Sequence, residues 1–177
     1  QSTRRILLAR VFLLAGSMAL LTGLASVTAN AAAAAVTETI KVINHDGAQA
    51  VLQAATDAAK RLNAPCAIAV VDQSGVLMAF DRMDDVRAGS PDLAIGKARA
   101  AALLQRPTSE IEDNTDQGRA AFVTAGFLSL RGGVPLSAGQ QVVGAVGVAG
   151  LNKDNDVKIA TEAAEAFTKS AAGDKTP

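Results

Sequence analysis

The chain has 177 residues, of which 49% are hydrophobic and 3% aromatic, and its formal net charge at pH 7 is zero. It contains neither tryptophan nor tyrosine, and acidic and basic side chains are equal in number, 17 of each. Nucleic-acid binding calls for a basic surface or stacking aromatic side chains, so this composition argues against nucleic acid as a partner. The single cysteine, Cys66, excludes an internal disulfide framework.

The first 31 residues have the layout of a secretory signal peptide. Arginines precede an apolar run over residues 11–27, and Ala29-Asn30-Ala31 fits the small-residue pattern at which such leaders are cleaved. An uncleaved membrane anchor is the alternative, but the run is barely long enough to span a bilayer, and glycine, serine and threonine interrupt it. Residues 3–8 also resemble a twin-arginine signal, which leaves the export route open.

These features predict the organisation of the chain. We expect a cleaved leader over residues 1–31, one domain over residues 32–169 and a flexible tail over residues 170–177. Loss of the three arginines in the leader leaves 14 of the 17 basic side chains against 17 acidic ones, a net charge of −3. The mature protein is therefore expected to be periplasmic or secreted, weakly acidic, and without a stable membrane anchor.

The first predicted helix covers residues 48–62, where apolar residues recur at helical spacing. Residues 36–43, which alternate between polar and apolar, precede it as a short edge strand or as the start of a helix. Between them lies the turn-like sequence Asn44-His45-Asp46-Gly47, in which Asn44 or Asp46 can cap the helix.

Two segments rich in small apolar residues, 66–85 and 131–150, are each predicted to form a β-hairpin. The sequence Asp72-Gln73-Ser74-Gly75 supplies the turn of the first hairpin. Glycines interrupt the last strand, which is typical of a bulge, a bend or a close approach by another group. The expected strands are residues 67–71, 76–83, 134–137 and 141–149.

Helices are expected between the hairpins and after the second one. Ser90 is expected to cap a helix that runs to about Leu104 and leaves Lys97 outside its apolar face. A short helical turn is expected within residues 108–118, and residues 120–127 can be helical, with a further strand near Phe127. This order predicts an α/β fold of the α+β type, in which helices flank a central, antiparallel, five-stranded sheet in a profilin-like arrangement.

Six motifs, in the right order, resemble the GlcG/HbpS-like family, which includes the C-terminal domain of the PduO type. The motifs are residues 69–77, 82–84, 90–98, 106–108, 132–136 and 143–150. The resemblance implies a profilin-like fold, homo-oligomers such as octamers and, in some members, haem binding. It also implies, for the exported branch that this chain matches best, haem or iron sensing and protection against oxidative stress.

His45 is the only histidine in the chain, so a haem held by imidazole must use it. Asp46 can orient its ring through a hydrogen bond. The alternative is an exposed histidine in a turn.

Arg82, Lys97 and Arg131 are candidates for binding the haem propionates or another anion through charge-assisted hydrogen bonds. Structural salt bridges, such as Arg82 with Asp84 or Lys97 with Asp92, are the alternative.

Glu162 and Glu165 form an E-x-x-E pair that resembles the iron-binding pattern of exported family members. With His45 they are the candidate metal ligands, and a solvated helix face is the alternative. The sulfur atoms of Cys66, Met78 and Met83 can also ligate a metal, but core packing is favoured for all three.

The chain contains no G-x-S-x-G motif, no nucleophile with a spaced histidine and aspartate, and no phosphate-binding loop. These absences favour a binding protein, although they do not exclude an enzyme. We therefore expect an exported, oligomeric protein that binds haem, with iron as a second candidate cofactor. The alternative is an accessory protein or enzyme acting on a small organic acid of the glycolate type or on a corrinoid.

Overall fold

The computed structural model describes residues 37–173, so the predicted leader, residues 1–31, lies outside the described residues. The chain divides between Thr39 and Ile40, and all the described helices and strands belong to the unit that begins at Ile40. No helix in the described range is both long and apolar enough to cross a membrane. The elements, in chain order, are α1 (His45–Arg61), β1 (Cys66–Asp72), β2 (Leu77–Arg82), α2 (Ser90–Leu104), α3 (Thr108–Asp116), α4 (Ala121–Thr124), β3 (Gly133–Ala138), β4 (Gln141–Gly150) and α5 (Lys153–Gly173).

Both predicted hairpins are confirmed, and together they make one antiparallel sheet in the order β2-β1-β4-β3. In the first hairpin the Asp72 carboxylate accepts hydrogen bonds from the backbone N–H groups of Ser74 and Val76, at 2.8 and 2.9 Å. These bonds fix the turn, and Gly75 completes it with a φ of 78°. The fold class is therefore as predicted.

The described residues form four strands rather than the five predicted. Residues 41–43 run beside the start of β4, but they make one backbone hydrogen bond to it, from Ile43 N to Val143 O at 3.1 Å. One bond of this kind does not make a strand. The residues near Phe127 form no strand either, because Leu128 packs against Gly96 of α2 instead.

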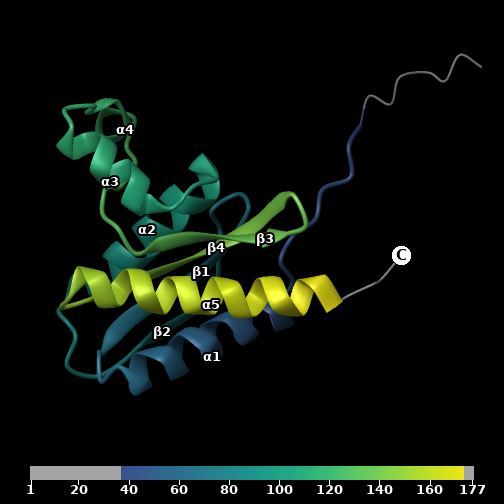
Figure 1. Ribbon diagram of the computed structural model, residues 1–177, viewed down its shortest axis with the longest axis horizontal. Helices are drawn as coiled ribbons and strands as arrows, with labels where there is room; N and C mark the ends of the chain where they lie inside the picture. Colours follow the sequence, from purple (N-terminus) through teal and green to yellow (C-terminus); the bar gives the residue numbers. More distant parts are fainter. Residues whose placement is uncertain (1–36, 174–177) are drawn as a thin grey trace, which may run out of the picture. The chain divides into compact units, whose positions relative to one another are not determined.

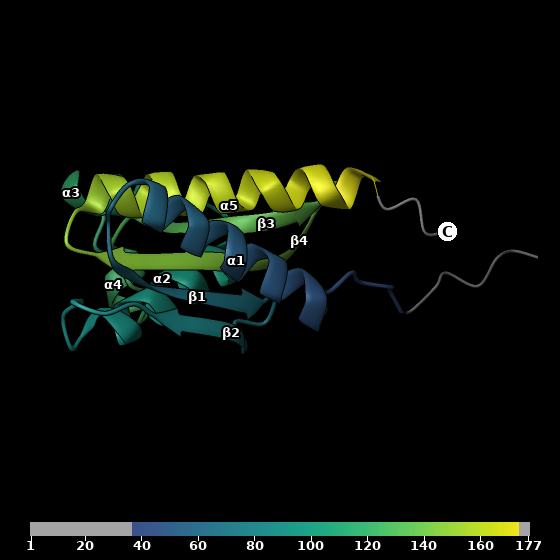
Figure 2. The same cartoon turned by 90° about the horizontal axis from the view of Figure 1, so that it is seen from below.

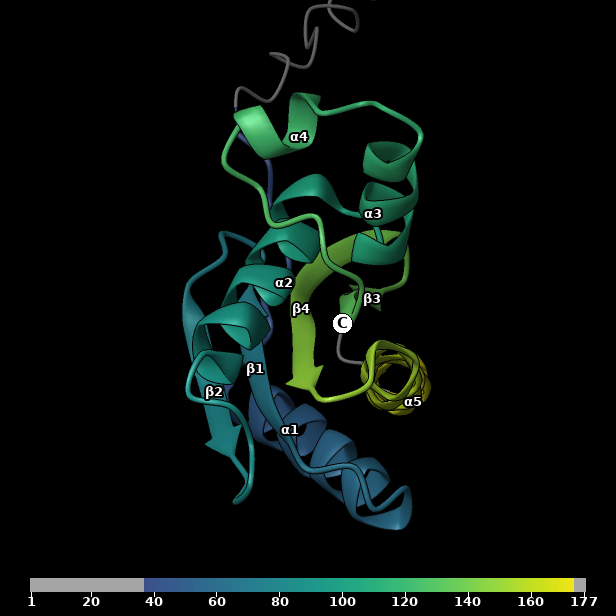
Figure 3. The same cartoon turned by 90° about the vertical axis from the view of Figure 1, so that its left-hand side faces the viewer.

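The sheet separates two layers of helices (Figure 1, Figure 3). Helices α1 and α5 cover one face and α2 covers the other, as the view from the α1 side confirms (Figure 2). Alternate residues of β1 point to opposite faces of the sheet. Ile68 and Val70 pack in the core under α1 and α5, whereas Ala67 and Ala69 pack in the core under α2. This arrangement explains why β1 is a continuous apolar run.

Helix α2 lies unusually close to the sheet. A Cβ atom at Gly147 of β4 would meet the backbone of Ala94 and Ala98. The buried residues on the facing sides are nearly all alanines, which keeps this layer thin. Gly147 therefore marks the close approach of a helix, one of the meanings predicted for the glycines of this strand.

Helix α1 begins at His45 rather than at residue 48, and two further helix ends differ from the predictions. Ser90 is the first residue of α2 rather than its cap, and Gly89 is the N-cap residue. Helix α5 continues to Gly173, so residues 170–173, predicted as the start of a flexible tail, are helical. The Ser170 hydroxyl donates to the carbonyl of Ala166 at 3.2 Å within that last turn.

The sulfur-containing candidates are core residues, as favoured from the sequence. Cys66 is 1% exposed, and Met78 and Met83 pack against the same core. Burial, and to a lesser degree the nearby carboxylate of Asp156, raises the pKa of the Cys66 thiol to about 12. The thiol is therefore protonated and inert at neutral pH.

Candidate functional site

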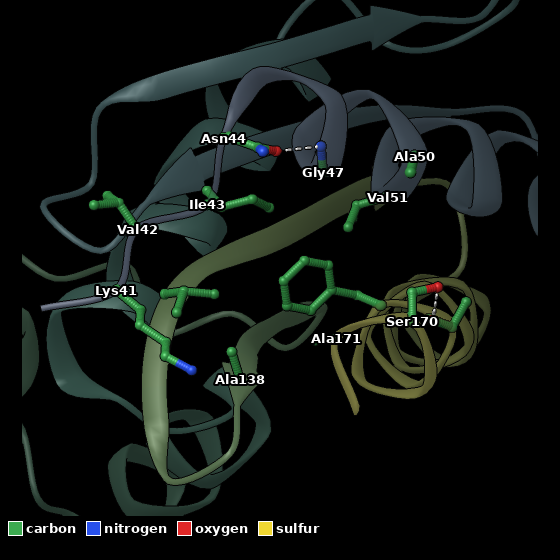
Figure 4. Close-up of a pocket in the computed structure, with 13 residues that line it drawn as sticks. Lys41, Val42, Ile43, Asn44, Gly47, Ala50, Val51, Ala138, Ser170 and Ala171 are labelled. Atoms are coloured by element: carbon green, nitrogen blue, oxygen red, sulfur yellow. Dashed lines mark hydrogen bonds between the residues drawn. The ribbon is translucent and has the colours of Figure 1, made fainter. Parts of the chain in front are cut away.

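The largest cavity described lies between the start of α1, the end of α5 and the start of β4 (Figure 4). Its volume is about 420 Å³, which is within the range of about 300–1,000 Å³ typical of small-molecule sites. The lining residues are Lys41, Val42, Ile43, Asn44, Gly47, Ala50, Val51, Ala138, Val143, Ala166, Phe167, Ser170 and Ala171.

Helical periodicity explains which residues of α1 face this cavity. Asn44, Gly47, Ala50 and Val51 recur three and four residues apart and so share one side of the helix. Asn44 also caps α1, since its side-chain oxygen accepts the N–H of Gly47 at 2.8 Å. The small side chains on this face leave space between the two helices, and that space is the cavity.

The polar side chains that line the cavity are few. The Asn44 oxygen is engaged by the helix cap, and the Ser170 hydroxyl by its own helix. Lys41 is the only charged residue in the lining. The cavity can therefore hold an apolar molecule and offer one positive charge to it.

His45 does not line the cavity. It is the first residue of α1 and is exposed, and a rotation of about 100° from Asn44 puts it on a different side of the helix. The side chains of Cys66, Met78 and Met83 do not line the cavity either. The lining thus supplies a place for an apolar body and an anion, and His45 lies next to its rim in the sequence.

Lys97 is 4% exposed, although the sequence predicts it outside the apolar face of α2. Its ammonium donates to Asp156 Oδ2 at 2.8 Å and to the Val148 carbonyl at 2.7 Å. The other carboxylate oxygen of Asp156 accepts the N–H of Gly150 at 2.7 Å. Lys97 is thus in a salt bridge, as the alternative interpretation proposed, but its partner is Asp156 rather than Asp92.

Arg131 is likewise held by carboxylates. It pairs with Glu112, and its Nη2 lies 2.8 Å from Asp113 Oδ1. The hydrogen bond to Glu112 and the charges of both carboxylates raise the pKa of Arg131 further above its usual range. Arg82 is exposed at the end of β2, and no ion pair described within residues 37–173 includes it.

The four predicted cofactor-binding residues are not brought together. Lys97 lies where β4 ends, and so does Gly132, the residue after Arg131. Arg82 lies at the same end of the sheet, because it pairs with Ala67 at the start of β1. His45 is at the other end, where β4 begins.

The three predicted metal ligands, His45, Glu162 and Glu165, do not gather either. Glu162 Oε2 lies 2.7 Å from Arg61 Nη2, whereas Glu165 lines a separate shallow groove beside β3. Within the described part of the chain, no group of three or more histidine, cysteine, aspartate or glutamate side chains is placed to hold a metal ion.

Lys41 and Phe167 belong to the cavity but were not predicted as site residues from the sequence. A signal for Lys41 was present, since it is a lone cation among the apolar residues Ile40, Val42 and Ile43. Phe167 lies on the apolar stripe of the last helix, where it is indistinguishable from a core residue.

Comparisons with known proteins place these features in a family. Residues 43–165 match the family model described as haem degrading protein HbpS-like. Protein GlcG of Escherichia coli is 42% identical over 108 residues, which are 60% of this chain and 81% of that protein.

Two solved structures are similar over most of the chain. A double mutant of HbpS from Streptomyces reticuli is 30% identical with a TM-score of 0.68, over 73% of this chain and 90% of that chain. A PduOC–haem complex is 25% identical with a TM-score of 0.65, over 71% of this chain and 94% of that chain.

Proposed function

The chain belongs to the HbpS-like family, and from this premise we propose that it binds haem without a covalent link, in the cavity between α1 and α5. The observation that carries the proposal is the cavity itself, since it combines an apolar lining with a single cation. Similarity to HbpS and to a PduOC–haem complex supports haem as the ligand.

In this proposal the side chains of the lining fit a porphyrin and a propionate, but none of them is an iron ligand. Apolar side chains such as Val51 and Phe167 would hold the porphyrin, and Lys41 would bind a propionate. His45 is the proposed iron ligand; it follows the rim residue Asn44 but lies on another side of α1, so it would have to reach over the rim. When bound, the haem iron would supply redox chemistry.

Hemin titration followed by absorbance tests the proposal. The purified protein should give a saturable Soret band, and Ala50→Trp, which adds bulk to the cavity wall, should weaken hemin binding at least about tenfold. Gln49→Trp is the matched control, because Gln49 is exposed, adjacent in α1 and outside the lining. Equal weakening by both variants, or by neither, would contradict the cavity as the haem site.

His45→Ala tests the iron ligand separately. If His45 ligates the iron, its removal should shift the Soret band and weaken binding, because imidazole then no longer contributes to coordination. A spectrum and affinity identical to those of the parent protein would remove His45 from the proposal while leaving haem binding intact.

An accessory protein or enzyme for a small organic acid or a corrinoid is the second candidate. The single cation of Lys41 in a cavity of about 420 Å³ favours the organic acid of the two. Glycolate or cobalamin should then raise the melting temperature in a saturable way where hemin does not.

The proposal also includes export to the periplasm or the medium, homo-oligomers, and a role in haem or iron sensing or in protection against oxidative stress. The leader pattern supports export. Exposed apolar side chains on and beside the edge strand β2, Val76, Leu77 and Phe80, support self-association. Cell fractionation and light scattering of the purified protein test the first two points.

A further inference from the structure

We infer that the cavity between α1 and α5 selects amphipathic carboxylates: the carboxylate pairs with Lys41, and the apolar body of the ligand lies against the remaining lining. The inference deepens the proposed function and rests on it for haem, whose propionates make it one such molecule. The selection for a carboxylate rests on the cavity alone.

The residues that line the cavity carry a single charge. Of its thirteen lining residues Lys41 alone is charged, and no carboxylate is among them. None of the ion pairs described within residues 37–173 includes Lys41, whereas Lys97, Arg61 and Arg131 each have an acidic partner. The Lys41 ammonium is therefore not neutralised by a described partner, as those other cations are.

The backbone around Lys41 is held in place, although it belongs to no helix or strand. Its N–H donates to the side-chain oxygen of Gln141 at 3.2 Å, and two residues on, Ile43 N donates to Val143 O at 3.1 Å. These bonds tie residues 41–43 to the start of strand β4. Figure 4 shows the Lys41 side chain extending toward the side of the cavity where Ala138 lies.

Two helix ends with opposite partial charges meet at the cavity. The first turn of α1 combines a partial positive charge with the carboxylate of Asp46, and the last turns of α5 carry a partial negative charge. These contributions oppose one another, so the positive charge of the cavity comes from Lys41. The lining residues of α5 include Ala166, Phe167 and Ala171, which present apolar surface. A ligand with a negative group at one end and a hydrocarbon body therefore matches both parts of the cavity.

Two pairs of probes, each a carboxylate and a neutral compound of similar apolar body, test the inference. Decanoate is compared with decanol, and hemin with its dimethyl ester, in each case by calorimetric titration. In each pair the carboxylate should bind about 3- to 10-fold more tightly than its neutral counterpart, and the preference should shrink as salt rises.

Variants of Lys41 connect this preference to one side chain. Lys41→Ala should abolish the preference, and Lys41→Arg, which keeps the charge, should retain most of it. Lys158→Ala is the control, because Lys158 is exposed on α5, outside the lining. Lys41 is exposed, so its variants are expected to fold.

The outcomes separate this inference from haem binding. If hemin binds but its ester binds equally well and Lys41→Ala changes nothing, the inference fails and the proposed function stands. If decanoate binds in a Lys41-dependent way and hemin does not bind, the inference stands and haem is the wrong ligand. Absence of binding by both carboxylates, or equal loss in Lys158→Ala, overturns the inference.

Discussion

The two ends of strand β4 and helix α5 are built in opposite ways. Where β4 ends and α5 begins, Lys97 and Asp156 are buried and paired, and each makes a hydrogen bond with a backbone group. Where β4 begins and α5 ends, the same two elements leave a cavity with one cation that no described acid neutralises. Polar groups that satisfy one another hold layers together, whereas a cation left beside apolar surface is available to a ligand.

The packed end should respond most strongly to mutation. Lys97→Met leaves the Asp156 carboxylate buried without its charge partner, which should cost about 3–5 kcal/mol of unfolding free energy. The double variant Lys97→Met/Asp156→Leu should recover part of that loss, because no unpaired charge remains. Denaturant titration of the parent protein and both variants measures these differences.

The cavity end supplies the control for this prediction. Lys41→Met, at an exposed residue, should change the unfolding free energy by no more than about 0.5 kcal/mol. Equal losses for Lys97→Met and Lys41→Met would show that the two ends do not differ in their dependence on a charged pair.

The close approach of α2 predicts the next largest effect. Gly147→Ala places a methyl group against the backbone of Ala94 and Ala98, which cannot yield as a flexible side chain would. Overpacking of this kind should cost about 1–3 kcal/mol, whereas Ala50→Leu in the cavity wall should be nearly neutral. Thermal unfolding of the two variants measures the contrast, and a neutral Gly147→Ala would contradict the close approach.

The smallest effect concerns pH. The pKa of the Cys66 thiol is raised from 9.0 to about 12 in the folded protein, so below pH 9 both the folded and the unfolded states keep the proton. Between pH 9 and 12 the unfolded chain releases it and the folded protein does not. Stability should therefore fall as pH rises through this window, by at most about 1.4 kcal/mol per pH unit.

Cys66→Ala should remove this part of the pH dependence. The difference in unfolding free energy between the two proteins, followed by urea titration from pH 8 to pH 11, isolates the thiol from other titrating groups. If the difference stays constant over this range, the pKa of the Cys66 thiol is not raised in the folded protein.

The hairpins were predictable because their signals are local. Turn residues such as Asp72 and Gly75, and the apolar runs beside them, determine both strands within about twenty residues of chain. The fifth strand, which was expected near Phe127, does not form, and its signals were weaker than those of the hairpins. Residues 36–43 alternate between polar and apolar, as an edge strand does. Whether they pair with β4 depends on how far β1 extends along β4.

The site was harder to predict because its residues are joined only by tertiary structure. Small residues occur on every side of α2, so the helix has no dominant apolar face, and the burial of Lys97 could not be inferred. Its partner Asp156 is 59 residues away in the chain. The cavity likewise joins Lys41 to Phe167, and the space between them results from small residues, which leave no distinctive pattern.

The described unit begins at Ile40 and its last helix ends at Gly173, so both of its ends are within a few residues of the cavity lining (Figure 2). A dye attached at either end would be tethered close to any molecule that enters. Fluorescence quenching by hemin at those two positions, compared with a dye at the exposed Leu151 beyond the opposite end of β4, would therefore follow occupancy without a change to the lining itself.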